Sequence, residues 1–227
     1  MKAALSIDAS KAAALFIDLQ EEHRKDSRYL VEGFDAIIAN VRRLQQTARA
    51  AGIPVLHSAY VVDLSTQPAK PFHPVMPDGS SAFSDVKNPL SAICPEVGPA
   101  GDEIVLVKTE ASTFAQGDAG MALRARGVEW VFIAGVWTEA CIAATVKDAI
   151  GLGFRVILVK DACGSGSAAM HQTAILNLAN RLYGGAVTDT DGACRMMAGE
   201  TVKAWMVEGS VPLRFTYENA ADLYLDL

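Results

Sequence analysis

Short apolar stretches recur along the chain, and polar residues or glycines follow most of them. Ala12–Ile17 is the clearest, because apolar residues fill it without alternation, as in strands that are buried on both faces of a sheet. Asp18 stands directly after it. The pattern predicts strands at Ala12–Ile17, from Pro54–Leu56 onward, and at Glu103–Val107, Val131–Ile133, Phe154–Val159 and Ala186–Thr188.

Between these strands, apolar residues recur at helical spacing. Leu30–Ala51 is the longest such segment, and Gly52 follows its end. Further helices are predicted over Asp118–Arg126, from Cys141 to about Gly151, over Ala168–Tyr183 and from Asp191 onward. Strands that alternate with helices indicate an α/β fold with a parallel sheet and helices on both of its faces. Without a linker or an internal repeat, we expect one domain over residues 1–227, with a core at about 12–190 and a C-terminal extension at about 200–227.

Three segments lack a clear period. Tyr60–Gly101 is rich in Pro, Ser and Gly, and a loop of this length is usually functional, so it could be a lid or an oligomer contact. Gln20–Arg28 is polar, and we expect a loop there with an exposed His23. Gly209–Leu227 could be an arm that docks on a neighbouring subunit or on its own core.

The composition argues against several classes of protein. The chain has 20 basic and 26 acidic residues, a net charge of −6 and no dense Lys/Arg run, so nucleic acid is not an expected partner. It has neither an apolar run that could span a bilayer nor a signal-peptide pattern, so we expect a cytoplasmic location and no membrane partner. The cysteines lack metal-finger spacing, and free thiols are expected at Cys94, Cys141, Cys163 and Cys194.

Three predicted strands lead to residues that could act together. Asp18 and Lys108 each follow a strand, and Cys141 follows a strand and a turn at the head of a helix. The carboxyl ends of parallel strands meet at one edge of a sheet, so these side chains could converge. Lys108 and the helix N-terminus would then lower the pKa of the Cys141 thiol. Taken alone, however, Cys141 could equally be a small buried apolar residue.

Such a trio would be suited to acyl transfer. Cys141 could attack a carbonyl carbon and form an acyl-enzyme, while Asp18 takes the thiol proton and later passes it to a leaving amine. Backbone N–H groups at the turn before Cys141 would face the developing oxyanion.

Several ordered motifs make the chain resemble the isochorismatase-like cysteine hydrolases, a family that includes nicotinamidases, N-carbamoylsarcosine amidohydrolases, ureidoacrylate and biuret hydrolases, and isochorismatases. The resemblance extends from about residue 12 to 190 and is weak at 60–100. His171 also stands where a later helix of the family often has His. The motifs are Leu15–Gln20 (LFIDLQ), Val107–Phe114 (VKTEASTF), Gly135–Cys141 (GVWTEAC), Thr145–Ala149 (TVKDA), Gly153–Val156 (GFRV) and Lys160–Ala162 (KDA).

The resemblance implies a Rossmann-like, three-layer fold with a six-stranded parallel sheet. It implies a catalytic triad of Asp18, Lys108 and Cys141, a cis peptide bond between Val136 and Trp137, and an oxyanion hole formed by the backbone N–H groups of Trp137 and Cys141. A homo-oligomer, either a dimer or a tetramer, is also expected. Trp137 could wall the substrate pocket or pack behind the turn, and the other candidate pocket residues are Gln20, Tyr60, His73, Ser112 and Phe114.

Two departures from the family narrow the expected activity. Nicotinamidases carry an Asp-x-His metal site after the second strand, whereas His57–Asp63 (HSAYVVD) lacks that spacing, so we expect neither a metal nor another cofactor. Isochorismatases that cleave a vinyl ether often lack the cysteine, so Cys141 favours C–N cleavage in a small amide, carbamoyl or ureido substrate. The alternatives are ether hydrolysis with Asp18 as the general acid, a non-catalytic oligomeric binding protein, or a redox-sensing thiol.

Overall fold

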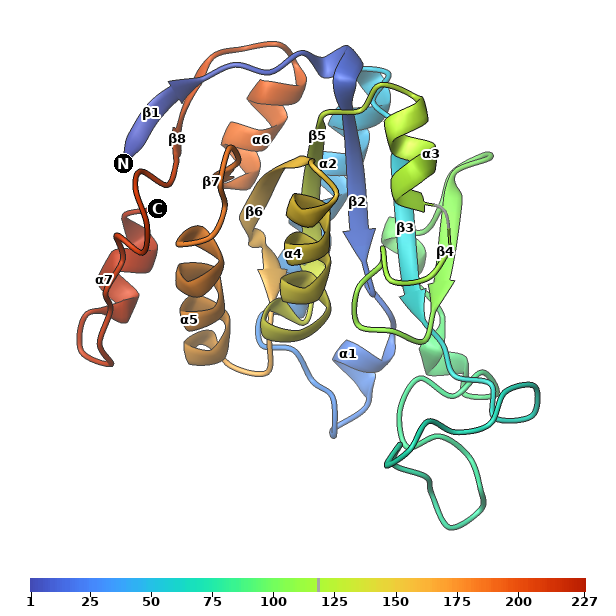
Figure 1. Ribbon diagram of the computed structural model, residues 1–227. Helices are drawn as coiled ribbons and strands as arrows, with labels where there is room; N and C mark the ends of the chain where they lie inside the picture. Colours follow the sequence, from blue (N-terminus) through green and yellow to red (C-terminus); the bar gives the residue numbers. More distant parts are fainter. Residues whose placement is uncertain (118) are drawn as a thin grey trace.

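The protein is built around one eight-stranded sheet, as a computed structural model that describes residues 1–117 and 119–227 shows (Figure 1). The strand order is β1-β8-β7-β6-β5-β2-β3-β4. The strands are β1 (Lys2–Leu5), β2 (Ala12–Ile17), β3 (Val55–Tyr60), β4 (Ile104–Lys108), β5 (Trp130–Val136), β6 (Arg155–Gly164), β7 (Ala186–Thr188) and β8 (Val202–Trp205).

The six strands β2 to β7 are parallel, as expected, but the sheet has two more strands than the six predicted. β8 pairs antiparallel with β7, and β1 pairs antiparallel with β8. Both added strands have only four residues. Each contains a lysine, and every residue of β1 is at least partly exposed, so neither strand is the uninterrupted apolar run that predicts a buried strand.

Helices cover both faces of the sheet, which confirms the predicted α/β class (Figure 1). α2 and α6 pack on one face, and α3, α4, α5 and α7 pack on the other. Asp118, the expected first residue of the third predicted helix, lies outside the described residues. The helices are α1 (Glu22–Lys25), α2 (Phe34–Ala50), α3 (Ala119–Ala125), α4 (Ala143–Gly151), α5 (Ala168–Ala179), α6 (Thr190–Met197) and α7 (Ala220–Leu225).

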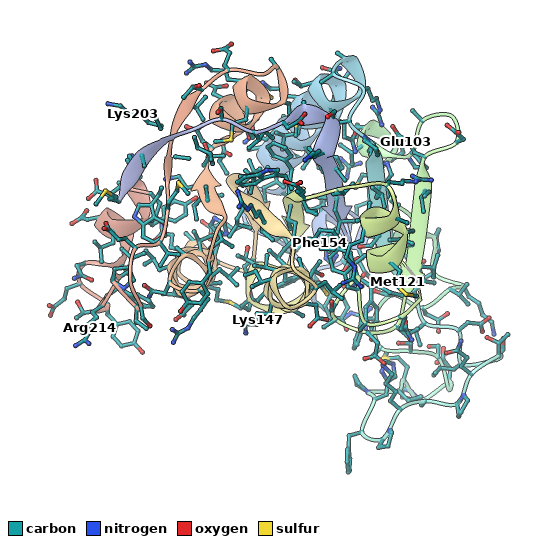
Figure 2. The ribbon with its side chains drawn as sticks, turned by 45° about the horizontal axis from the view of Figure 1, so that its top comes forward. Glu103, Met121, Lys147, Phe154, Lys203 and Arg214 are labelled. Carbon is teal, nitrogen blue, oxygen red and sulfur yellow. The ribbon has the colours of Figure 1, made fainter. Side chains whose placement is uncertain are left out.

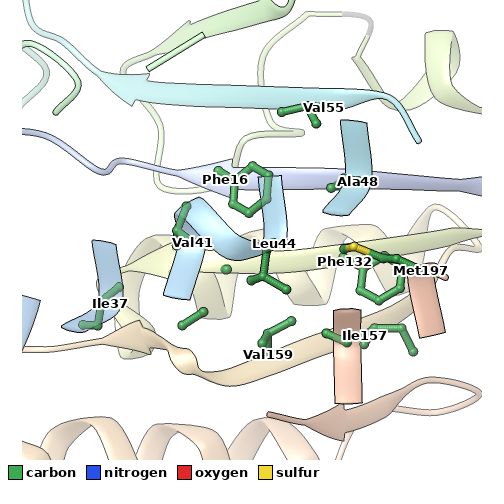
Figure 3. Packing of buried hydrophobic residues seen from close by; sticks show 14 of the residues in the cluster. Phe16, Ile37, Val41, Leu44, Ala48, Val55, Phe132, Ile157, Val159 and Met197 are labelled. Atoms are coloured by element: carbon green, nitrogen blue, oxygen red, sulfur yellow. The ribbon is translucent and has the colours of Figure 1, made fainter. Parts of the chain in front are cut away.

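The apolar side of α2 and the strands beneath it form one half of the core. Val41 and Leu44 of α2 lie over Phe16 of β2 and Phe132 of β5, and all four side chains are buried (Figure 3). On the opposite face, α3 and α4 form part of the outer layer, and Met121 and Lys147 carry exposed side chains there (Figure 2). Burial of both faces explains why β2 is entirely apolar.

Several predicted boundaries move, each for a local reason. α2 begins at Phe34 rather than Leu30, because Gly33 has a φ of +69° that a right-handed helix cannot continue. β6 continues past Val159 to Gly164, since a register shift lets its last residues pair again with β5. The polar segment after β2 contains a short helix, α1, and His23 within it is buried rather than exposed.

The long segment between β3 and β4 extends beyond the carboxyl edge of the sheet and has short helical turns at Pro89–Ser91 and Pro95–Val97 (Figure 1). On the side of the sheet where β1 and β8 lie, α7 of the C-terminal segment packs against α5 of the same chain (Figure 1). Within residues 1–117 and 119–227, every helix is too short or too polar to cross a membrane.

Candidate active site

The chain reverses its winding direction at the centre of the sheet. The parallel strands run in the order β4-β3-β2-β5-β6-β7, so β2 and β5 are neighbours although β3 and β4 separate them in the sequence. The helices that follow two such strands lie on opposite faces, which leaves a crevice at the carboxyl edge where α/β proteins bind ligands. Asp18 follows β2 at this point, and a π-helical turn, Thr138–Ile142, follows β5 and contains Cys141.

The three side chains predicted to converge do meet in this crevice. Lys108 is the last residue of β4, and its long side chain spans β3 to reach Asp18. Its Nζ lies 2.7 Å from Asp18 Oδ2 and 3.4 Å from Cys141 Sγ. Asp18 and Lys108 are both 2% exposed, so their ion pair is shielded from water.

Further hydrogen bonds surround the Asp18–Lys108 ion pair. Ser58 Oγ donates to Asp18 Oδ1 at 3.0 Å, and Lys108 Nζ donates to the Glu110 carbonyl oxygen at 3.2 Å. Thr113 Oγ1 then donates to Ser58 Oγ at 3.2 Å. A buried ion pair is stable only when such additional hydrogen bonds compensate for lost hydration.

The backbone at this point is unusual on both strands. Asp18 has a φ of 53°, a left-handed value that costs a residue with a side chain about 1 kcal/mol or more. Gly135 of β5 lies so close to β2 that an added Cβ would stand 2.1 Å from the Ile17 carbonyl oxygen. The peptide bond between Val136 and Trp137 is cis, as the family resemblance implied.

The expected low pKa of the Cys141 thiol is wrong. This pKa is raised to about 12, chiefly by burial and next by the negative charge of Asp18. Lys108 lowers the pKa of the thiol but does not outweigh these two effects. The prediction counted Lys108 and the helix N-terminus without the second charge and the loss of water. Cys141 therefore rests as a neutral thiol beside an ion pair.

A cavity of about 330 Å³ opens beside Asp18 and Cys141, whereas Lys108 is not among its lining residues. Asp18, Cys141 and Trp137 are among its lining residues, so a ligand in the cavity could contact the thiol directly. The remaining lining residues come from α1 and the residues after it, the end of β3, the β3–β4 segment and the residues after β4: Glu22, His23, Tyr29, Tyr60, Lys70, Phe83, Ser84, Thr109, Glu110 and Ala111.

Among the predicted pocket residues, Trp137 and Tyr60 line this cavity. Trp137 Nε1 donates to His23 Nδ1 at 3.3 Å, which holds the indole in the wall. The ring of Tyr60 lies 5.0 Å below Lys108 Nζ. Trp137 thus lines the cavity and contacts His23, and Tyr60 lines the cavity and contacts Lys108.

The other four predicted pocket residues lie outside the lining. Gln20 is fully buried and hydrogen-bonds the Tyr60 and Ser91 backbones, so it holds the loop. Ser112 accepts the N–H of Phe114, whose ring stacks on Phe154 in the core. His73 hydrogen-bonds Ser81 and packs behind Phe83, one residue removed from the cavity.

Sequence reasoning missed Glu22, His23, Phe83 and Ser84. Glu22 and His23 belong to a helix too short to show a period, and Phe83 and Ser84 lie in the segment with the weakest motifs. The available signal was the polarity of Glu22 and His23 so close to the strand end of Asp18.

One group of metal-type ligands occurs among the described residues, at Glu21, Cys94 and Glu96. Arg24 already pairs with both carboxylates, at 2.5 Å from Glu21 and 2.9 Å from Glu96. His57, from the motif compared with the nicotinamidase metal site, pairs with Glu103 at 2.9 Å. Glu21 and Glu96 therefore belong to an ion-pair network around Arg24, and His57 belongs to a pair with Glu103.

Comparisons with known proteins identify the family of this chain. The family model for the isochorismatase domain matches residues 12–192. A maleamate amidohydrolase from Pseudomonas putida is 31% identical, over 80% of this chain and 84% of that protein. An N-carbamoylsarcosine amidase from Arthrobacter is 25% identical, over 83% of this chain and 72% of that protein.

Solved structures give the same result. An isochorismatase family protein from Desulfovibrio vulgaris has a TM-score of 0.74 and 27% identity, over 83% of this chain and 98% of that chain. A cysteine hydrolase from Pseudomonas syringae pv. phaseolicola shares the fold with a TM-score of 0.76 and 20% identity, over 86% of this chain and 95% of that chain. This chain therefore belongs to the isochorismatase-domain family of hydrolases.

Proposed function

We propose that the protein is a cysteine amidohydrolase that cleaves the C–N bond of a small amide, carbamoyl or ureido substrate through a Cys141 thioester. The observation that carries the proposal is the position of Lys108 Nζ, 2.7 Å from Asp18 Oδ2 and 3.4 Å from Cys141 Sγ, where Asp18 and Cys141 both line a ligand-sized cavity. Relatives named maleamate amidohydrolase, N-carbamoylsarcosine amidase and ureidoacrylate amidohydrolase support amide chemistry.

In the first step, Cys141 Sγ attacks the substrate carbonyl carbon while its proton moves to Asp18. Because the pKa of the buried thiol is raised to about 12, a free thiolate is rare, and proton transfer must accompany attack. This transfer leaves the total charge of Asp18, Lys108 and Cys141 unchanged. The Lys108 ammonium, in contact with both partners, stabilises the anion wherever it resides.

The carbonyl oxygen then carries the negative charge. We propose that the backbone N–H groups of Trp137 and Cys141 donate to it, since both lie where β5 passes into the helical turn and α4. N–H groups in the first turn of a helix have no intrahelical acceptor and suit an oxyanion.

In the second half of the reaction, the C–N bond breaks and protonated Asp18 gives its proton to the leaving nitrogen. The product amine or ammonia departs, and the acyl group stays on Sγ as a thioester. Water then attacks the thioester carbonyl and gives a proton to Asp18, which returns it to Sγ as the C–S bond breaks. The thiol, the carboxylate and the ammonium are restored.

The test is ammonia release from a panel of small amides, carbamoyl compounds and ureides, with Cys141→Ala compared to wild type. We expect Cys141→Ala to reduce turnover at least about 10³-fold while leaving circular dichroism unchanged. Hydroxylamine should capture the acyl group as a hydroxamate in wild type only. Near-normal amide turnover in the alanine variant would refute the thioester route.

The same variants separate the alternative of ether cleavage. A vinyl-ether hydrolase with Asp18 as general acid would keep its activity in Cys141→Ala and lose it in Asp18→Asn. Amide hydrolysis through the thioester requires both residues, so both variants should be inactive on the amide panel.

A further inference from the structure

A buried carboxylate forms part of the cavity wall. Glu22 is 2% exposed and lines the cavity, yet it has no place in the proposed chemistry of Cys141. Its oxygens accept hydrogen bonds from the backbone N–H of Ser84, at 3.0 Å, and from the Ser84 hydroxyl. Ser84 has a left-handed φ of 49°, so strained backbone presents these donors to Glu22.

Glu22 differs from the other charged groups at the cavity because it has no cationic partner among the described residues. Asp18 pairs with Lys108, and Glu110 pairs with Lys70. His23, the next residue, cannot supply the charge, because burial lowers its pKa despite the opposing effects of Glu22 and Asp18. Arg28, which lies over the ring of Tyr29, is already paired with Asp26. Glu22 is therefore the one carboxylate among the described lining residues that lacks an ion-pair partner.

The wall beside Glu22 is also aromatic. The rings of Tyr29, Tyr60 and Phe83 line the same cavity, and Phe83 lies 6.2 Å from Tyr29 and 5.7 Å from Tyr60 between ring centroids. Aromatic faces attract cations through their quadrupole, and they attract carboxylates poorly. The carboxylate and the rings therefore favour the same kind of ligand.

We propose that the substrate of this site carries a positively charged nitrogen group at the end remote from the scissile amide, and that Glu22 binds that group. This inference rests on the proposed function, since it takes the cavity above Cys141 as the substrate site. A carboxylate at the same position would face Glu22 without a free cation. Lys70, the remaining ammonium group of the wall, already donates to Glu110 and to the Thr109 carbonyl oxygen, the latter at 2.7 Å.

The test uses Cys141 itself as the reporter, so that it does not depend on amide turnover. Wild-type protein is treated at pH 8.5 with methanethiosulfonates whose ethyl group ends in an ammonium, a methyl or a sulfonate. Labelling of the Cys141 peptide is followed by mass spectrometry, and each rate is divided by the rate of the same reagent with glutathione. We expect the order ammonium, methyl, sulfonate, with about tenfold or more between the first and the last.

The variants assign the preference to one residue. Glu22→Gln keeps the shape and one acceptor for Ser84, and it should reduce the ammonium-to-sulfonate ratio about tenfold. Glu129→Gln, an exposed change outside the cavity, should leave the ratio as in wild type. Equal normalised rates for the three reagents in wild type, or a ratio that Glu22→Gln leaves intact, would overturn the proposal.

A parallel measurement distinguishes this inference from the proposed function. Ammonia release is compared for β-alaninamide, butyramide and succinamate, which share a carboxamide and end in an ammonium, a methyl and a carboxylate. The inference expects β-alaninamide to have the highest kcat/KM and succinamate the lowest. Ordered labelling of Cys141 without turnover of any amide would support the charge preference and count against the proposed reaction alone.

Discussion

At the residue scale, the protonation state of Cys141 is set by burial and by two charged neighbours. Burial raises the pKa of the thiol most, the Asp18 carboxylate raises it further, and the Lys108 ammonium lowers it. Because Asp18 and Lys108 are themselves paired at 2.7 Å, their effects on the sulfur largely oppose each other. The resting sulfur is therefore a neutral thiol, and a simple alkylating reagent reacts only with its small thiolate fraction.

This arrangement predicts how single substitutions move the pKa of Cys141. Asp18→Asn removes a negative neighbour and should lower the pKa, whereas Lys108→Met removes the positive neighbour and should raise it. The measurement is the rate of iodoacetamide alkylation of Cys141 between pH 6 and 10. In wild type the rate should rise roughly tenfold per pH unit across this range, because the pKa of about 12 lies above it.

The two variants control for each other, since both break the same ion pair while their charge effects on the thiol have opposite signs. At pH 8, alkylation should be faster in Asp18→Asn and slower in Lys108→Met than in wild type. A wild-type rate that levels off below pH 8 would contradict the raised pKa.

At the element scale, the site depends on how closely β2 and β5 approach where the winding of the sheet reverses. Gly135 pairs with Ile17 in register and has a φ of 130° that residues with side chains rarely adopt. An added Cβ would stand 2.1 Å from the Ile17 carbonyl oxygen, one residue before Asp18. A side chain at position 135 would therefore displace the strand end that carries Asp18.

Gly135→Ala should consequently lower the free energy of unfolding by at least about 3 kcal/mol, through steric overlap and backbone strain combined. Urea denaturation followed by circular dichroism measures this change. Gly151→Ala is the matched control, because a Cβ at this α4 residue would meet nothing within 4 Å, and it should be neutral or slightly stabilising. Similar stabilities for the two variants would show that the close approach is unimportant.

At the scale of the whole molecule, the meeting of Asp18, Lys108 and Cys141 at the strand ends could be predicted from the sequence, but most of the cavity could not. Asp18 and Lys108 follow apolar strands, and the carboxyl ends of parallel strands share one edge, so two general rules bring them together. Ser84 and Glu22 meet only because the β3–β4 segment folds back over α1. No periodicity encodes that contact, and the thiol pKa depends on burial that such contacts create.

A homo-oligomer, a single domain and a cytoplasmic location stay predictions.

A chain of hydrogen bonds connects the C-terminal segment to the turn that carries Cys141. Thr138 Oγ1 donates to the Gly164 carbonyl oxygen at 2.9 Å, so it must accept from His171 Nδ1–H, at 2.8 Å. His171 Nε2 then accepts from the Tyr224 hydroxyl of α7 at 3.1 Å. This arrangement requires a neutral imidazole, and burial lowers the pKa of His171 to about 4.

The lowered pKa predicts a loss of stability in mild acid. His171 in the unfolded chain takes up a proton near pH 6.5, whereas the folded protein resists protonation until about pH 4. The contribution of neutral His171 to the free energy of unfolding is therefore complete above pH 6.5. It is lost as the pH falls toward 4, by roughly 2–3 kcal/mol. Asn at position 171 could retain one donor and cannot titrate, so His171→Asn should show a flatter decline in unfolding free energy between pH 7 and 4.5. Because His23 and His57 also have lowered pKa values and are unchanged in this variant, the difference between the two slopes isolates His171. Parallel slopes would show that the neutral hydrogen-bond chain does not couple folding to pH.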